Sequence, residues 1–124
     1  MLRIVKSMAV VAVAGLLASQ AQADDAKHGA EIFQRCAICH SNTKGAAAKI
    51  GPNLFGVVGR KAGTEANFSY SAAMKGSGIT WTPDKLAAYV EHPQQVVPGN
   101  RMAFAGITSK SDAEALVEYL ETLK

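Results

Sequence analysis

The pentapeptide Cys36-Ala-Ile-Cys39-His40 constrains this chain more than any other feature. Two thiols separated by two residues and followed at once by a histidine are typical of a c-type haem attachment site. Each thiol can add to one vinyl group of the porphyrin, and a short helical turn then places the imidazole of His40 beneath the iron. We therefore expect one haem c per chain, bound covalently through Cys36 and Cys39, with His40 as an axial iron ligand. A chain that binds a haem has to fold around a large, flat and mostly apolar group.

Two other roles are open to a Cys-x-x-Cys pair. A redox-active disulfide usually opens a helix in a fold that alternates strands with helices, and this sequence has little strand signal. A structural zinc site needs four ligands, commonly two Cys pairs or a Cys pair plus a His pair. The chain has no second Cys pair, and His28 and His92 are far apart in sequence. Haem attachment is the interpretation we favour.

The N-terminus has the pattern of a secretory signal peptide. Two basic residues precede an apolar run of eleven residues, 8–18, and Ala21-Gln-Ala23 is a small-x-small cleavage site. The run is much shorter than the roughly 20 residues that span a bilayer. We expect residues 1–23 to be removed, leaving residues 24–124 in the bacterial periplasm without stable membrane insertion. An uncleaved signal that anchors the domain to the membrane is the alternative.

The charge of the mature chain is modest. Removal of Arg3 and Lys6 leaves 11 basic residues against 10 acidic ones, a net charge of +1. This balance argues against a nucleic-acid-binding protein. Basic side chains dominate the first four-fifths of the mature chain, whereas acidic side chains crowd its last predicted helix. A single domain with one basic and one acidic end has a dipole that can orient it during docking.

Apolar spacing and capping residues predict a few short helices separated by loops. The expected helices are one from about Asp25 to Arg35 capped by Asp24 or Asp25, one over 69–75, one that begins at a Thr82 cap and ends at Pro93, and one opened by the capping box Ser111-Asp-Ala-Glu114. The glycine-rich segment 45–63 predicts irregular backbone.

Several further segments resemble one family in the right order. They are Gly29-Ala-Glu-Ile-Phe33, the haem motif, Gly51-Pro-Asn-Leu54, Gly59-Arg-Lys61, Gly78-Ile-Thr-Trp81 and Val97-Pro-Gly-Asn-Arg-Met-Ala-Phe104. The mature chain is similar to class I c-type cytochromes of the mitochondrial cytochrome c and bacterial cytochrome c2 type. The resemblance implies an all-α fold wrapped around one haem, in which the first and last helices cross. Gly29 would allow their close approach, with Phe33 against Leu116, Tyr119 and Leu120.

The resemblance also implies the surroundings of the haem. Met102 matches the second axial iron ligand, and Met74 is the one competing methionine of the mature chain, which we expect to serve packing. The backbone carbonyl of Pro52 would accept a hydrogen bond from His40, and Tyr89 and Asn100 would hydrogen-bond around the methionine sulfur. Arg60, Tyr70 and Trp81 match the positions that donate to a buried haem propionate.

A haem with both axial positions filled by protein suits outer-sphere transfer of single electrons rather than catalysis. We therefore expect a monomeric electron carrier and not an enzyme. Its partners would be redox complexes, with a bc1-type complex as donor and a terminal oxidase, photosynthetic reaction centre or reductase as acceptor. They would dock on a basic face around the exposed haem edge. The candidates for this face are Lys27, Arg35, Lys49 and Arg101.

The chain differs from many mitochondrial members on the predicted docking face. Gln94 and Gln95 stand where those members carry lysines, so the basic face has fewer positive charges than theirs.

Two other functions are alternatives to an electron carrier. A haem peroxidase or gas sensor would need an open axial site, against which the Met102 segment argues. A fixed haem subunit anchored by its N-terminus is the other alternative.

Overall fold

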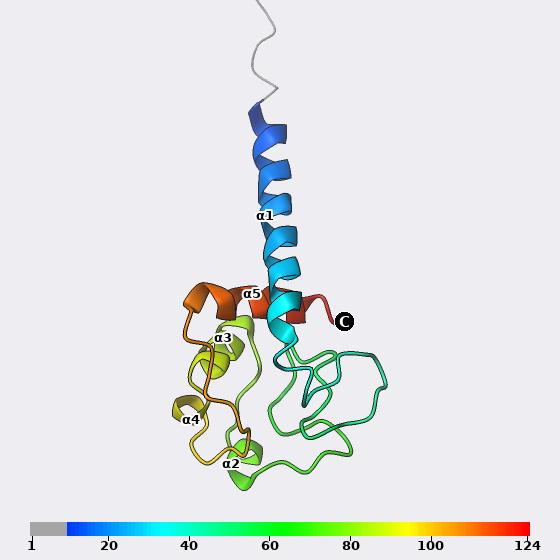
Figure 1. The fold of residues 1–124 in the computed structure, drawn as a ribbon, viewed down its shortest axis with the longest axis vertical. Coiled ribbons are helices and arrows are strands. Elements are labelled where there is room, and N and C mark those ends of the chain that lie inside the picture. The colour runs from blue at the N-terminus through cyan, green and yellow to red at the C-terminus, as the bar shows by residue number, and fades with distance from the viewer. Residues whose placement is uncertain (1–9) are drawn as a thin grey trace, which may run out of the picture.

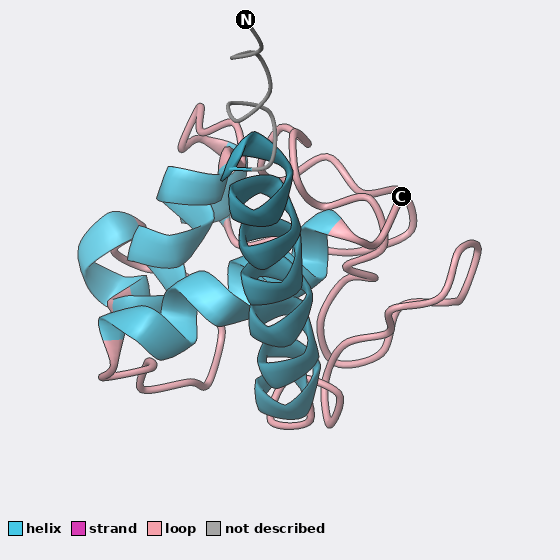
Figure 2. Ribbon diagram, turned by 90° about the horizontal axis from the view of Figure 1, so that it is seen from above, coloured by secondary structure: helices cyan, strands magenta, loops and turns pink. Residues whose placement is uncertain are grey.

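The computed structural model describes residues 10–124, which form helices and loops (Figure 1, Figure 2). The helices of this part are α1 (Val10–Phe33), α2 (Ala72–Lys75), α3 (Pro83–Glu91), α4 (Pro93–Val96) and α5 (Lys110–Glu121). Across residues 10–124, extended pairing is limited to one isolated bridge between Lys61 and Thr80. The predicted all-α fold is confirmed. The basic start of the predicted signal peptide, within residues 1–9, lies outside the described residues.

Helix α1 is longer than the sequence predicted. It begins at Val10, so Asp24 and Asp25 lie inside the helix and do not cap it. The preceding residues include several alanines, leucines and glutamines, which favour helix and continue it without a break. The N-terminal part of α1 projects away from the other elements (Figure 1). Among the helices of residues 10–124, none combines the length and apolar character needed to cross a bilayer.

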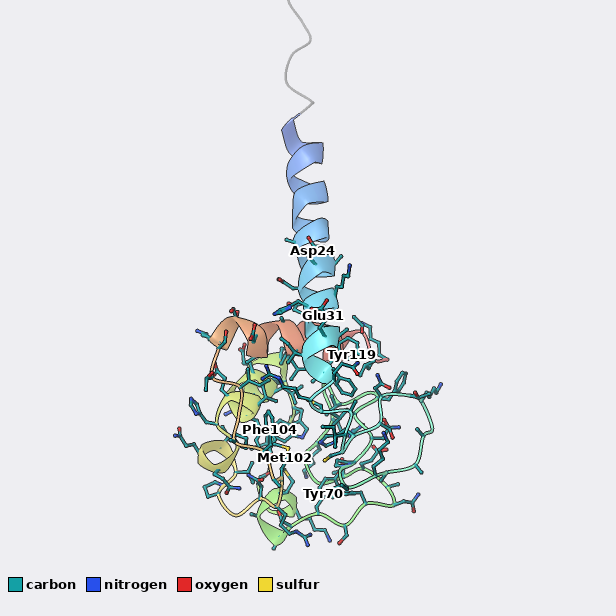
Figure 3. All side chains as sticks on the ribbon, in the orientation of Figure 1. Asp24, Glu31, Tyr70, Met102, Phe104 and Tyr119 are labelled. Carbon is teal, nitrogen blue, oxygen red and sulfur yellow. The ribbon has the colours of Figure 1, made fainter. Side chains whose placement is uncertain are left out.

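Helix α5 crosses α1 near the C-terminal end of α1, as predicted (Figure 1). A Cβ atom at the buried Gly29 would overlap the carbonyl oxygen of Ala115 and lie 2.8 Å from the Cβ of Tyr119. The rings of Phe33 and Tyr119 have centroids 5.3 Å apart, and Leu116 joins Phe33 in the core. Figure 3 shows Tyr119 beside the crossing. Glycine is therefore required at position 29 because two helix backbones meet there.

The predicted N-cap of α3 is confirmed, whereas the predicted N-cap of α5 is not the one in the structure. The Thr82 hydroxyl accepts a hydrogen bond from the N–H of Lys85, as expected for the cap of α3. The predicted capping box at Ser111 is wrong, because α5 begins earlier and Ser109 is its N-cap. The Oγ of Ser109 accepts from the N–H of Asp112 at 3.3 Å. Asp112 thus occupies the third helical position, where a cap hydroxyl reaches the backbone.

Pro93 follows the end of one helix, as the sequence predicted, and also begins the next. Helix α3 ends at Glu91, and Pro93 is the first residue of α4, a position that tolerates its missing N–H. Helix α3 packs against α5 and buries Leu86 and Tyr89. The segment between α1 and α2 is irregular, as its glycines predicted, and forms the side of the molecule opposite α3 and α4 in Figure 1.

A hydrogen-bonded contact between α1 and α5 depends on pH. The Nε2 of His28 lies 3.0 Å from Oδ1 of Asp112, and its Nδ1 lies 3.6 Å from Oε2 of Glu31. The hydrogen bond with Asp112 raises the pKa of His28 above its ordinary value. Because the folded-state pKa is raised, the added stability is fully present below about pH 6.5 and is lost as the pH rises through the folded-state pKa.

We therefore expect wild type to exceed His28→Gln in stability at about pH 5.5, and the difference to shrink by about pH 8. Denaturant unfolding of the haem-loaded protein at both pH values measures this. A difference that stays constant or grows with pH would contradict it.

Candidate functional site: a cavity between helices and loops

A cavity of about 450 Å³ lies between the helices and the irregular segment. This volume is in the range of small-molecule and cofactor sites. The walls are mostly apolar and come from segments far apart in the chain. They include Leu54, Val57, Phe68, Trp81, Leu86, Val90, Phe104, Leu116 and Leu120. Figure 3 shows Met102, Phe104 and Tyr70 in this region, below α5. The cavity can take a large apolar group.

Both thiols of the pentapeptide lie in the cavity wall. The chain turns tightly after α1, since the N–H of Cys36 donates to the carbonyl of Phe33 at 2.7 Å and the N–H of His40 to that of Cys36 at 2.8 Å. Cys36 and Cys39 are free and half-buried, and both line the cavity with His40. Burial raises the pKa of the Cys36 thiol to about 11. No disulfide joins the pair, and among residues 10–124 no group of three or more His, Cys, Asp or Glu could hold a metal ion.

His40 is oriented by two neighbours. Its Nδ1 lies 2.7 Å from the carbonyl oxygen of Pro52, the acceptor that the resemblance implied. When Nδ1–H donates to this oxygen, Nε2 keeps its lone pair for a metal. Burial lowers the pKa of His40, which keeps the ring neutral. A Cβ at Gly51 would overlap the ring and lie 2.7 Å from Nδ1. Gly51 is thus a positioning residue that sequence reasoning missed.

Met102 enters the same cavity from the loop after α4. The hydroxyl of Tyr89 lies 4.0 Å from its sulfur, and burial raises the pKa of Tyr89 to about 12, so the hydroxyl stays a donor. Met74 also lines the cavity, from α2, and packs against the hydrophobic core. The contact between the Tyr89 hydroxyl and the sulfur of Met102 distinguishes the two thioethers.

Asn100 holds the Met102 loop through the backbone. Its Nδ2 donates to the carbonyls of Pro93 at 3.0 Å and Val97 at 2.9 Å, and its Oδ1 accepts from the N–H of Met102 at 2.9 Å. Asn100 is buried, and these three hydrogen bonds occupy both the Nδ2 and the Oδ1 of its side chain. The hydrogen bonds expected of Asn100 around the methionine therefore go to the backbone of this loop, including that of Met102 itself.

Arg60, Tyr70 and Trp81, which the resemblance implied as donors to a haem propionate, all line the cavity. The guanidinium of Arg60 donates to the carbonyls of Asn53 at 3.0 Å and Phe55 at 2.7 Å. Its Nη2 also lies 3.3 Å from Oε2 of Glu65. The hydroxyl of Tyr70 accepts from the N–H of Glu65 at 3.2 Å.

Sequence reasoning did not single out Glu65. One signal could have found it, because Glu65 is the only acidic residue between Glu31 and Asp84. An isolated carboxylate in a basic stretch is a candidate partner for a nearby arginine.

Two of the four predicted docking cations line the cavity, and a third lies beside the pentapeptide. Arg35 and Arg101 line it, and Arg101 also donates to the carbonyl of Ser69 at 3.2 Å. The Nζ of Lys49 donates to the carbonyl of Ala37 at 3.2 Å, which places Lys49 beside the pentapeptide. Lys27 is exposed on α1 and is not among the residues that line the cavity.

An all-α fold with two thiols, an imidazole and a thioether around one apolar cavity defines a c-type cytochrome. The family model for cytochrome c matches residues 26–124. A cytochrome c2 from Rhodopila globiformis is 46% identical over 101 residues, covering 81% of this chain and 94% of that protein. A cytochrome c from Arabidopsis thaliana is 46% identical over 98 residues, covering 78% and 88%.

A solved structure has the same fold. Cytochrome cH from Methylobacterium extorquens aligns with a TM-score of 0.74 and 36% identity, covering 78% of this chain and 97% of that one. The chain belongs to the cytochrome c family. Proteins of this family bind one covalent haem c and are electron carriers rather than enzymes.

Proposed function

We propose that this chain is an exported, soluble one-electron carrier whose haem c is held by thioethers to Cys36 and Cys39 and by His40 and Met102 as axial ligands. The observation that carries the proposal is the meeting of these four side chains in the wall of one apolar cavity. The haem supplies the reversible exchange of one electron, and an apolar enclosure and a thioether ligand both favour its reduced form.

Contacts around the cavity hold the two proposed iron ligands in place. Pro52 and Gly51 fix the imidazole of His40, while Asn100 fixes the backbone of Met102 and Tyr89 lies near its sulfur. With His40 and Met102 both holding the haem iron, no position at the iron would remain for a substrate, oxygen or peroxide. A rigid, low-dielectric surround also rearranges little when the charge changes. These properties favour an electron carrier over a peroxidase or a sensor.

The propionates of the haem would be met by Arg60, Tyr70 and Trp81. Partner complexes would dock on the face of Arg35, Lys49 and Arg101, with Lys27 farther away on α1. We propose the same partners as the sequence suggests: a bc1-type donor, and an oxidase, reaction centre or reductase as acceptor. The carrier would be a monomer in the bacterial periplasm after removal of residues 1–23, with residues 24–124 as its single domain.

Expression with export tests the proposal. We expect an N-terminus at Asp24 in the purified protein, one reversible one-electron wave in voltammetry and no turnover of peroxide. An N-terminus that keeps the signal would favour an anchored subunit. Steady turnover of peroxide would favour an enzyme and contradict the proposed role.

Glu65 should lower the reduction potential. Its carboxylate lies against Arg60, a pair whose side chains are 13% and 33% exposed, and it therefore offsets the positive charge that Arg60 would offer a propionate. We expect Glu65→Gln to raise the midpoint potential by about 20–60 mV, since removing a negative charge disfavours the ferric form. Redox titration measures the shift. Glu114→Gln, in the groove between α3 and α5 and outside the cavity lining, is the matched control and should shift the potential much less. A fall in potential for Glu65→Gln would contradict the assignment.

A further inference from the structure

Gln94 makes two hydrogen bonds to the loop that carries Met102, here called the Met102 loop (residues 97–102). Its Nε2 donates to the carbonyl oxygen of Asn100 at 3.0 Å, and its Oε1 accepts from the N–H of Gly99 at 3.1 Å. Gln94 is an exposed residue of α4, where water could take both of these places. An exposed side chain that instead engages two successive residues of one loop needs an account.

The two hydrogen bonds require both ends of a carboxamide. The loop offers a donor at Gly99 and an acceptor at Asn100, and the side chain of glutamine has one of each. A glutamate could accept from Gly99 but could not donate to Asn100 when it is ionised. Gly99 has a φ of +88°, and a Cβ there would also lie 3.3 Å from the Cβ of Ala73 in α2. Gln94 therefore fits one particular left-handed turn of the loop.

A second amide holds the Met102 loop from inside the protein. The buried side chain of Asn100 bonds to the backbone of Pro93, Val97 and Met102, as described above. The loop is thus fastened to α4 by one buried amide and one exposed amide. Hydrogen bonds that face solvent are the first to open in local fluctuations of a folded protein. Gln94 is therefore the outer fastening, whose release can precede any opening of the core.

Gln94 acts on the site through the backbone. Asn100, Arg101 and Met102 line the cavity, whereas Gln94 is not among the lining residues. The carbonyl that accepts from Gln94 belongs to the peptide bond between Asn100 and Arg101, one residue before Met102. The position of that peptide sets where the side chain of Met102 enters the cavity. Gln94 is therefore a positioning residue.

We propose that Gln94 is a latch that keeps the Met102 loop closed and so sets how often the iron loses its thioether ligand. This inference rests on the proposed function, because it needs Met102 as an axial ligand. Departure of Met102 would open an axial position to outside ligands and would lower the potential. A latch of two exposed hydrogen bonds corresponds to about a tenfold difference in opening rate, at the low end of what two such bonds contribute.

Imidazole binding to the ferric, haem-loaded protein tests the proposal. Imidazole can reach the iron only after Met102 has left it, so at high imidazole concentration the observed rate becomes the rate of loop opening. The exchange breaks one iron–sulfur bond and forms one iron–nitrogen bond, and the oxidation state does not change. Stopped-flow absorbance at the weak far-red band follows the loss of the methionine ligand.

We expect Gln94→Ala to raise this limiting rate about tenfold. Gln94→Glu, which keeps the acceptor and loses the donor, should fall between wild type and Gln94→Ala. The matched control is Gln95→Ala, because Gln95 is the next residue of α4, equally exposed, and makes neither hydrogen bond. Its rate should stay near that of wild type.

Hydrogen exchange gives a second measurement that does not depend on the iron. The N–H of Gly99 should exchange about tenfold faster in Gln94→Ala, because it loses its acceptor. The amides of α5 should keep their wild-type rates, since the latch acts on one loop. Faster exchange throughout α5 would mean a loss of global stability and would overturn the proposal.

The latch and the proposed function fail in different ways. If Gln94→Ala binds imidazole at the wild-type rate while both proteins show the far-red band, the latch is overturned and the proposed function stands. If the wild-type ferric protein lacks this band and its binding rate rises with imidazole concentration without reaching a limit, Met102 is not a ligand. That result would contradict the proposed function and the latch with it.

Discussion

Replacing Met102 by alanine should abolish the six-coordinate state and lower the reduction potential on the order of 0.1 V or more, because axial ligands set haem potentials over about 0.8 V. The soft thioether favours ferrous iron, and alanine cannot ligate. The loop would keep its shape, since Asn100 binds the backbone N–H of Met102 rather than its sulfur. Loss of the weak far-red band of the ferric protein, together with the fall in potential, would show this change.

Met74→Leu is the matched control for Met102→Ala. Both methionines line the cavity, but it is the sulfur of Met102 that lies 4.0 Å from the hydroxyl of Tyr89. We expect Met74→Leu to keep the far-red band and to change the potential little. Loss of the band in Met74→Leu, with the band retained in Met102→Ala, would reverse the ligand assignment.

Gly29→Ala should destabilise the folded protein by about 2 kcal/mol or more. Alanine favours helix over glycine by about 1 kcal/mol, so a propensity effect alone would be stabilising. The new Cβ, however, would overlap the carbonyl oxygen of Ala115 and force α1 and α5 apart. Overpacking of this kind costs about 1–3 kcal/mol and occasionally more, and here the obstacle is backbone, which cannot change rotamer.

Thermal unfolding of the haem-loaded variant measures this cost, and a loss of about 10 °C or more in Tm corresponds to it. Lys27→Ala, at an exposed position of the same helix, should leave Tm nearly unchanged. A Gly29→Ala protein as stable as wild type would mean that the two helices do not meet as closely as the structure indicates.

The sequence predicted those parts of the site that depend on local chemistry. The spacing of Cys36, Cys39 and His40 is a covalent requirement of haem attachment, so it is visible in five residues. Helix α3 was predicted from Thr82, because a cap and its helix are neighbours in the chain. The acceptor role of Pro52 and the crossing at Gly29 came from the family resemblance, and the structure has both contacts.

The remaining features depend on contacts between distant or competing groups. Nothing in the order of residues says that Glu65 meets Arg60, or that the ring of His40 rests on Gly51. The start of α5 was misplaced because Ser109 and Ser111 are both good caps, and the choice depends on where the helix packs. The start of α1 differs from the prediction because residues 10–23 are attached here, and Asp25 can cap a helix only when the residues before it are removed.

The optical spectrum of the purified protein in both redox states tests the central claim most directly. We predict the reduced spectrum of a c-type haem that survives denaturation, because the thioethers to Cys36 and Cys39 are covalent, and a weak far-red band in the ferric state from the iron–methionine bond. A five-coordinate high-spin spectrum, or a protein without haem after export, would contradict the proposal that this cavity holds the six-coordinate haem of a one-electron carrier.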